Sequence, residues 1–161
     1  MNNIKEFENM YSECYVLDKV IWDKYDMKQT KVNVVELIRN YKELKSKYIH
    51  LAASNELGLT AHNIENIHSK SFSKNRFNEK IDIQIEMEKD LKIKAAIFEK
   101  LNKCFTENEK QYYDYCLQNN KSEERLRDRL GGLSKLGLLP IKNSCVLKIA
   151  LAFNKAVTKK K

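Results

Sequence analysis

Three arginines at alternate positions in one short segment are the residues of this chain best suited to binding chemistry. The chain uses 25 Lys but only 5 Arg, and Arg125, Arg127 and Arg129 are three of the five. A planar guanidinium can hold a phosphate or a guanine edge through two parallel hydrogen bonds, which the point charge of a lysine cannot do. Residues 119–161 hold 11 basic and 3 acidic residues, whereas residues 1–118 hold 19 of each. The net charge of +8 therefore lies in the C-terminal quarter, which predicts a nucleic-acid-binding surface there.

Two arrangements of the segment after Thr106 would present these charges to DNA. In the first, residues 137–140 form a turn, and the helix after it is a recognition helix whose N-terminal side chains meet base edges. In the second, residues 122–136 form the recognition helix and residues 138–153 fold back as a β-wing. Apolar residues recur at helical spacing in the last segment, which favours the first arrangement. The sequence at residues 133–139 resembles the end of a helix that precedes a wing, which favours the second. The candidate DNA-binding residues are Lys142, Asn143, Ser144 and Lys148 for the first arrangement, Arg125, Arg127 and Arg129 for the second, and Lys135 and Lys155 beside them.

The elements that must position these residues are predicted to be helices. Only four Gly and one Pro occur in 161 residues, too few for the many tight turns of a β-sandwich or barrel. Apolar residues recur at helical spacing over residues 3–26, 34–51 and 80–104, and a short helix is expected at residues 61–68. We therefore expect an all-α protein.

This pattern predicts three regions along the chain. Residues 1–53 are expected to form a helical hairpin or a coiled-coil arm that could join two copies into a homodimer. Residues 54–79 are weakly patterned and polar, which is typical of a linker. Residues 80–161 are expected to form a helix-turn-helix bundle, with the winged-helix variant left open.

Local signals mark where the C-terminal helices begin and end. Thr106 and Glu109 have the spacing of a capping box, in which each side chain satisfies a free backbone N–H at the helix start. The break at residues 119–121 is followed by Ser122, which predicts the N-cap of another helix with glutamates in its first turn. Gly131-Gly132 either ends this helix or permits close approach to a neighbouring helix or a phosphate, because each glycine costs about 1 kcal/mol relative to Ala inside a helix.

Other classes of function have little support in the residues. The four cysteines are widely separated and the three histidines lack partners at ligand spacing, so we expect neither a disulfide framework nor a metal site. The chain carries no Gly-rich phosphate loop, no Gly-x-Ser-x-Gly and no His-Glu-x-x-His, so we expect a non-enzymatic protein without a cofactor. There is no secretory signal and no apolar run near the ~18 residues of a membrane span, so we expect a cytoplasmic location.

Residues 80–158 resemble the phage late-transcription regulators of the ArpU/RinA type, whose C-terminal part is similar to region 4 of bacterial sigma factors. The likeness rests on a long helix at residues 81–101, a capped aromatic-rich segment at residues 105–115, the basic helix, and a last helix that ends with residues 152–157. The connection at residues 130–141 is longer and richer in glycine than the short turn that such families use. The resemblance implies binding to promoter DNA and contact with RNA polymerase.

These patterns predict a sequence-specific DNA-binding transcriptional regulator of the phage or mobile-element type. Its expected partners are double-stranded DNA and RNA polymerase. The alternative is a small phage- or plasmid-encoded interaction protein that inhibits a host protein or nucleoprotein complex, in which case the basic tail would meet an acidic protein or an RNA. Binding to duplex DNA that weakens steeply with salt is expected only of the regulator.

Overall fold

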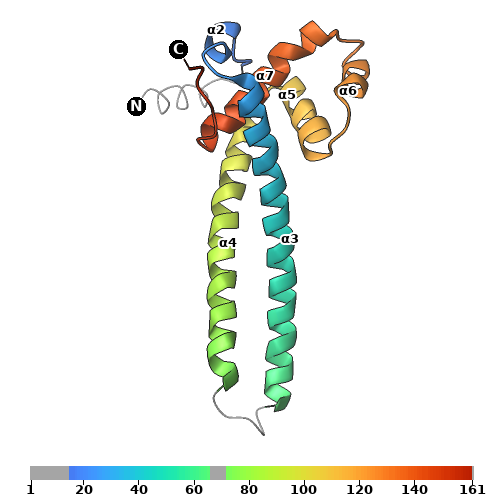
Figure 1. Ribbon diagram of the computed structural model, residues 1–161. Coiled ribbons are helices and arrows are strands. Elements are labelled where there is room, and N and C mark those ends of the chain that lie inside the picture. Colours follow the sequence, from blue (N-terminus) through green and yellow to red (C-terminus); the bar gives the residue numbers. More distant parts are fainter. Residues whose placement is uncertain (1–14, 66–71, 161) are drawn as a thin grey trace. The chain divides into compact units, whose positions relative to one another are not determined.

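The computed structural model describes residues 15–65 and 72–160, and all extended regular structure in these ranges is helical (Figure 1). The predicted all-α fold is confirmed. The only β-type pairing among these residues is an isolated bridge between Tyr25 and Thr158. The elements are α2 (Lys19–Trp22), α3 (Met27–Glu65), α4 (Phe72–Cys104), α5 (Glu107–Tyr112), the π-helix η1 (Tyr113–Gln118), α6 (Glu123–Arg129) and α7 (Lys135–Ala152).

Internal contacts divide the chain into two compact units. One, here called the core unit, comprises residues 15–38 and 97–160 of the described chain; the other, the hairpin unit, lies within residues 39–96. The regions expected from the sequence had boundaries near residues 53 and 80, which fall inside α3 and α4. The described part of the expected linker is helical. There, α3 and α4 continue beyond the residues whose apolar spacing predicted them.

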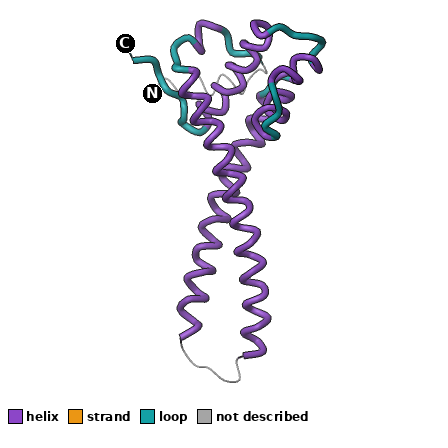
Figure 2. Tube along the Cα trace, turned by 45° about the vertical axis from the view of Figure 1, so that its right-hand side comes forward, coloured by secondary structure: helices purple, strands orange, loops and turns teal. Residues whose placement is uncertain are grey.

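The hairpin unit consists of the distal parts of α3 and α4, which run side by side in opposite directions (Figures 1 and 2). Tyr41, on α3, is buried. Asn55 is also buried and donates a hydrogen bond from its side-chain amide to Gln84, so the polar group inside the hairpin is satisfied. The sequence predicted a hairpin from its first two helices, but the pair observed is α3 with α4.

The predicted helix over residues 3–26 is wrong for its described part. Residues 15–18 and 23–26 are not α-helical, and only the four-residue α2 lies between them; residues 3–14 lie outside the described chain. Asp18, which interrupts the apolar stripe, is the N-cap of α2 and accepts a hydrogen bond from the Ile21 N–H at 3.2 Å. The aspartate therefore starts a helix at the position where the prediction required one to continue.

Helix α7 is the centre of the core unit. Every residue from Asn143 to Ala150 is buried, as expected for a helix that is apolar on nearly all sides. The shell around it comes from α3, the end of α4, α5, η1 and α6, through Val34, Leu37, Ile38, Leu101, Phe105, Tyr112, Leu117 and Leu126. Ring contacts extend this shell, since Phe98 and Phe153 lie with their centroids 4.8 Å apart.

The start of α7 contradicts both arrangements predicted for this segment. Ser134 is the N-cap and accepts a hydrogen bond from the Gly137 N–H at 3.0 Å, so the helix begins seven residues before Lys142. Residues 138–152 are helical, which rules out the wing. Pro140 lies inside the helix near its N-terminus, where its ring removes one backbone donor without ending the helix. A Cβ at Gly137 would lie 3.0 Å from the Leu133 side chain, so glycine serves close packing here rather than a turn.

The caps predicted for α5 and α6 are confirmed. Both hydrogen bonds of the Thr106–Glu109 capping box are present, and Ser122 accepts from the Arg125 N–H at 3.3 Å. Gly131 and Gly132 adopt φ angles of +84° and +79°, in the left-handed region that glycine tolerates. The glycine pair therefore terminates α6, which was one of its two predicted roles.

Candidate nucleic-acid interface

Helix α6 displays the three arginines of the basic segment. Arg125 and Arg129 are exposed, and Arg127 is half-buried. Arg129 lies over the ring of Tyr115 at 4.6 Å from its centroid, an arrangement that fixes the guanidinium without neutralising it. Within the described part of the chain, no ion pair occupies any of the three arginines. Their charges are therefore available to an external anion.

The first turns of α7 lie next to α6 along the chain and add a further cation and two leucines. Lys135, the first residue of the helix, is exposed and has no ion-pair partner among the described residues. Leu136 is 80% exposed and Leu139 is 38% exposed. This end of the helix thus presents one charge and an apolar edge to solvent, whereas its middle is buried.

A groove separates α6 from the start of α7. It has a volume of about 390 Å³ and is lined by Glu123, Glu124, Arg127, Lys135, Leu138, Leu139 and Lys142. We call it the α6–α7 groove. Its walls contain three cationic and two anionic side chains, so its charge balance depends on which of these are already paired.

Glu123 is paired and does not offset the free cations. Its Oε1 atom lies 3.1 Å from Nζ of Lys31 and 2.9 Å from Nζ of Lys142, and it accepts a hydrogen bond from the Tyr112 hydroxyl at 3.3 Å. Partial burial acts to raise the pKa of Glu123, but the hydrogen bonds from Lys142 and Lys31 outweigh it and lower the pKa below its ordinary value. Burial, followed by the charge of Glu123, raises the pKa of the Tyr112 hydroxyl. Lys142 is therefore half-buried and committed to an internal ion pair.

Asn143, Ser144 and Lys148 were predicted to point at DNA, and the structure contradicts that prediction. All three side chains are buried, and Lys148 is only 1% exposed. The prediction followed from placing the start of the last helix at residue 142. Because α7 begins at Lys135, this stretch falls in the middle of the helix and faces the interior of the core unit on every side.

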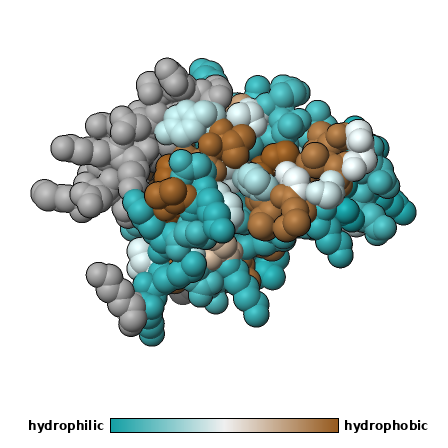
Figure 3. All heavy atoms as spheres, turned by 90° about the horizontal axis from the view of Figure 1, so that it is seen from above, coloured by the Kyte–Doolittle hydropathy of each residue, from teal (hydrophilic) through white to brown (hydrophobic). Residues whose placement is uncertain are grey.

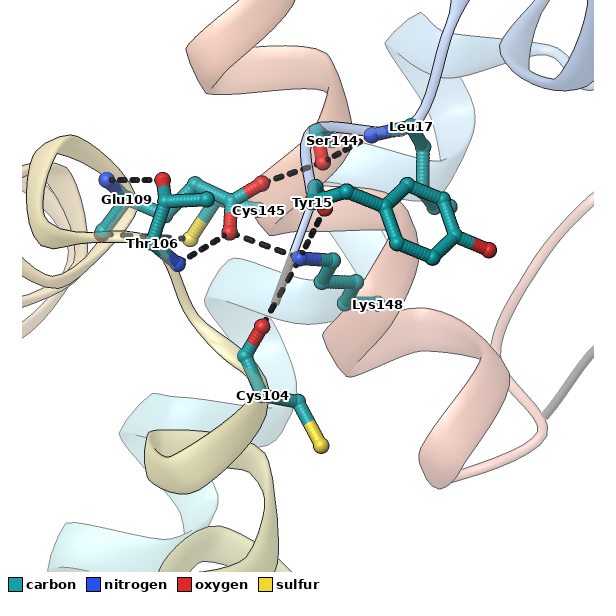
Figure 4. A network of polar contacts seen from close by, with 8 residues as sticks. All are labelled: Tyr15, Leu17, Cys104, Thr106, Glu109, Ser144, Cys145 and Lys148. Carbon is teal, nitrogen blue, oxygen red and sulfur yellow. Dashed lines mark hydrogen bonds and ion pairs between the residues drawn. The ribbon is translucent and has the colours of Figure 1, made fainter. Parts of the chain in front are cut away.

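Lys148 belongs to a buried polar network (Figure 4). Its ammonium group forms an ion pair with Glu109 at 2.8 Å and donates to the backbone carbonyls of Cys104 at 2.9 Å and Tyr15 at 2.6 Å. All three ammonium donors therefore have an acceptor, as a buried lysine requires.

Both carboxylate oxygens of Glu109 also have hydrogen-bond donors. One carboxylate oxygen, Oε2, accepts from the Thr106 N–H of the capping box at 2.9 Å and pairs with Lys148, and the other, Oε1, accepts from the Ser144 hydroxyl. Ser144 in turn accepts from the Leu17 N–H at 2.7 Å. The network joins α5, α7 and the segment before α2, and we assign it a structural role.

Lys155 is exposed but is not brought together with the other candidates. It follows the C-terminal end of α7, whereas Lys135 is the first residue of the helix. An 18-residue helix is about 27 Å long. Of the predicted set, Arg127 and Lys135 line the α6–α7 groove together, whereas Arg129 lines a separate pocket with Tyr115 and Asp114. Arg125 is exposed and lies on the same face of α6 as Arg129, because the two are four residues apart.

Within residues 15–65 and 72–160, the remaining groups to consider are metal-ligating side chains and free thiols. No group of three or more His, Cys, Asp or Glu in these ranges is arranged to hold a metal ion. Cys104 and Cys145 are buried free thiols. Burial raises the pKa of the Cys145 thiol, and partial burial raises that of Cys116. No described helix combines the length and the apolar character needed to cross a bilayer.

Leu136, Leu139 and the Lys148 network were not found by sequence reasoning. Lys148 interrupts the otherwise apolar run Cys145–Ala152, and a lone charge inside such a run signals a buried ionic partner. No protein-family model matches this chain, and neither a curated protein nor a solved structure matches it. The function is therefore inferred from the charged surface of α6 and the start of α7.

Proposed function

We propose that the core unit binds duplex DNA as a transcriptional regulator, through α6 and the first two turns of α7. The observation that carries this proposal is that Arg125, Arg127, Arg129 and Lys135 lie close together in the sequence, are exposed or half-buried, and have no ion-pair partner among the described residues. Lys148 is paired with the buried Glu109, and Lys142 shares the single carboxylate of Glu123 with Lys31, so ion pairs offset part of the charge of the basic segment. Cations without ion-pair partners suit the phosphates of DNA.

In this proposal α6, the connection at residues 130–134 and α7 act as a helix-turn-helix, with α7 as the recognition helix. In such modules the N-terminal residues of the second helix meet base edges and the first helix crosses the backbone. Lys135 and Leu136 are the first two residues of α7, and their N–H groups lack intrahelical acceptors as at any helix start. The arginines of α6 would then contact phosphates, which position the module without reading sequence.

The assignment to phage or mobile-element regulation and the contact with RNA polymerase rest on the resemblance of residues 80–158 alone. A second candidate is the interaction protein that inhibits a host complex. The exposure of Leu136, and of Leu139 in the lining of the α6–α7 groove, favours it, because exposed apolar side chains also suit a protein partner. The two candidates differ in whether duplex DNA binds at all.

The test is fluorescence anisotropy of the full chain with duplexes from its own flanking genomic DNA, measured over a range of salt concentrations. The slope of log K against log salt is expected to be about −0.9 for each phosphate contacted. Arg125→Ala and Lys135→Ala should each weaken binding and make the slope shallower by about 1. Lys28→Ala and Lys100→Ala remove exposed lysines elsewhere in the core unit and serve as matched controls that should leave the slope unchanged.

All four variants alter exposed side chains, so thermal unfolding should be the same as for the unsubstituted protein. If the four variants lose equal affinity, the charge acts without a defined site and the proposed interface is wrong. If the full chain binds no duplex and instead retains a protein partner on purification, the second candidate replaces the first.

A further inference from the structure

Leu136 has the most exposed of the large apolar side chains that the structure describes. It is the second residue of α7, at the end that the proposed function directs toward DNA. Leu139 is three residues further on and is also exposed, so both lie on the same side of the helix. Figure 3 shows apolar residues exposed among hydrophilic ones when the molecule is seen from above.

Among the lining residues of the α6–α7 groove beside Leu139, two cations and one carboxylate, Glu124, have no ion-pair partner in the described chain, so the free charge there is positive on balance. Lys135 precedes Leu136 directly, and Leu139 shares the α6–α7 groove with Arg127 and Lys135. Neither cation has an ion-pair partner in the described ranges. An apolar contact framed by free positive charge matches a surface that is anionic overall but carries isolated apolar groups.

The major groove of DNA is such a surface. Its edge of phosphates is anionic, and the C5-methyl of thymine is the apolar group that its base pairs present there. We infer that Leu136, together with Leu139, contacts thymine methyl groups and so gives the proposed DNA site a preference for thymine. This inference rests on the proposed function and names what the recognition helix reads.

The spacing of the two leucines fits neighbouring base pairs. Residues three apart in an α-helix are separated by about 4.5 Å along its axis. Successive bases on one strand are about 3.4 Å apart. When the start of α7 lies along the major groove of DNA, this spacing places Leu136 and Leu139 against neighbouring base pairs. Two successive thymines are therefore the favoured contact.

The experiment replaces thymine by deoxyuridine, which removes only the methyl group. Duplexes bound by the full chain are selected from a random pool, and each thymine of the selected site is then replaced singly. Loss of one methyl contact is expected to weaken binding about fourfold at one or two positions, the equivalent of one buried CH₂. Leu136→Ala should bind the thymine duplex about as weakly as the unsubstituted protein binds the deoxyuridine duplex.

The decisive observation is the combination of the two changes. For Leu136→Ala, deoxyuridine at the contacted position should cost nothing further, because the side chain that senses the methyl is gone. Val20→Ala is the matched control, since Val20 is 73% exposed on α2 in the same unit, and this variant should keep the full response to deoxyuridine. Thermal unfolding of both variants should be unchanged.

Three outcomes overturn the inference. If duplexes are bound with no response to deoxyuridine at any position, the thymine contact is wrong but the proposed function stands. If Leu136→Ala responds as strongly as the unsubstituted protein, another residue reads the methyl. If no duplex is bound and Leu136→Ala releases a protein partner, the leucines form a protein-docking surface and the proposed function fails with the inference.

Discussion

Replacing Lys148 with methionine is expected to lower the free energy of unfolding by about 3–5 kcal/mol, although no exposed contact is lost. The substitution keeps the length and apolar stem of the side chain and removes the charge. Glu109 is fully buried, so its carboxylate would lose the cation that lies 2.8 Å away and would have no water to replace it. The carbonyls of Cys104 and Tyr15 would also lose a buried donor.

A double-mutant cycle isolates the ion pair from this general loss. Glu109→Gln removes the negative charge but keeps a residue that can complete the capping box with Thr106. Each single variant leaves one unpaired buried charge, whereas Glu109→Gln combined with Lys148→Met leaves none. The combined variant is therefore expected to be more stable than the sum of the single effects implies, by about 1–3 kcal/mol.

The assay is urea unfolding followed by far-ultraviolet circular dichroism. With a denaturant dependence of about 2 kcal/mol per M, the loss for Lys148→Met corresponds to a midpoint about 2 M lower. Lys92→Met is the matched control, because Lys92 forms an exposed ion pair with Glu88 at 2.7 Å and its removal should leave the midpoint unchanged. If Lys148→Met behaves like Lys92→Met, or if the cycle shows no coupling, the reasoning about the buried pair is refuted.

Three further outcomes follow from the geometry. Glu123 has a pKa lowered below 4.5 by Lys142 and Lys31, so its ionised form stabilises the fold above that pH; the stability difference from Glu123→Gln, measured by urea unfolding, should shrink as the pH falls below 4.5, and a constant difference would contradict the pairing. Gly132→Ala should cost about 1–2 kcal/mol because of the positive φ, although a Cβ there meets no atom within 4 Å; calorimetry showing no loss would contradict this. Cys145 should react with a thiol reagent at pH 8 only on unfolding, as read by mass spectrometry, and labelling of the native protein would show that it is accessible.

The features predicted correctly from the sequence are those that depend on residues close together in the chain. The side chains of Thr106 and Glu109 each accept a hydrogen bond from the other's backbone N–H, three positions apart. The Ser122 side chain accepts from the Arg125 N–H, so each cap can be recognised without the tertiary fold. The glycine pair ends α6 for a similarly local reason. Arg125 and Arg129 are exposed and Arg127 is half-buried, because α6 is short and buries only Leu126.

The start of α7 was missed because Gly137 and Pro140 are turn residues in most contexts. Ser134 supplies an N-cap that the sequence analysis did not identify, and Pro140 is the sixth residue of α7, where it removes one backbone donor but the helix continues. The close contact with Leu133, which requires glycine at residue 137, exists only in the folded chain.

The burial of Lys148 depends on contacts far apart in the sequence. Its partner Glu109 is 39 residues away, and the carbonyl of Tyr15 is 133 residues away. Composition counts every lysine as a surface charge, but Lys148 is buried in an ion pair with Glu109, and Lys142 is half-buried and shares Glu123 with Lys31.

The most direct test of the proposed DNA interface is an amide NMR titration of the full chain with a duplex of about 20 base pairs from its flanking genomic DNA. We predict that the largest shifts fall within residues 122–139, covering α6 and the start of α7, and that residues 143–150 in the buried part of α7 change little. Absence of shifts, or shifts concentrated outside α6 and the start of α7, would contradict the proposal.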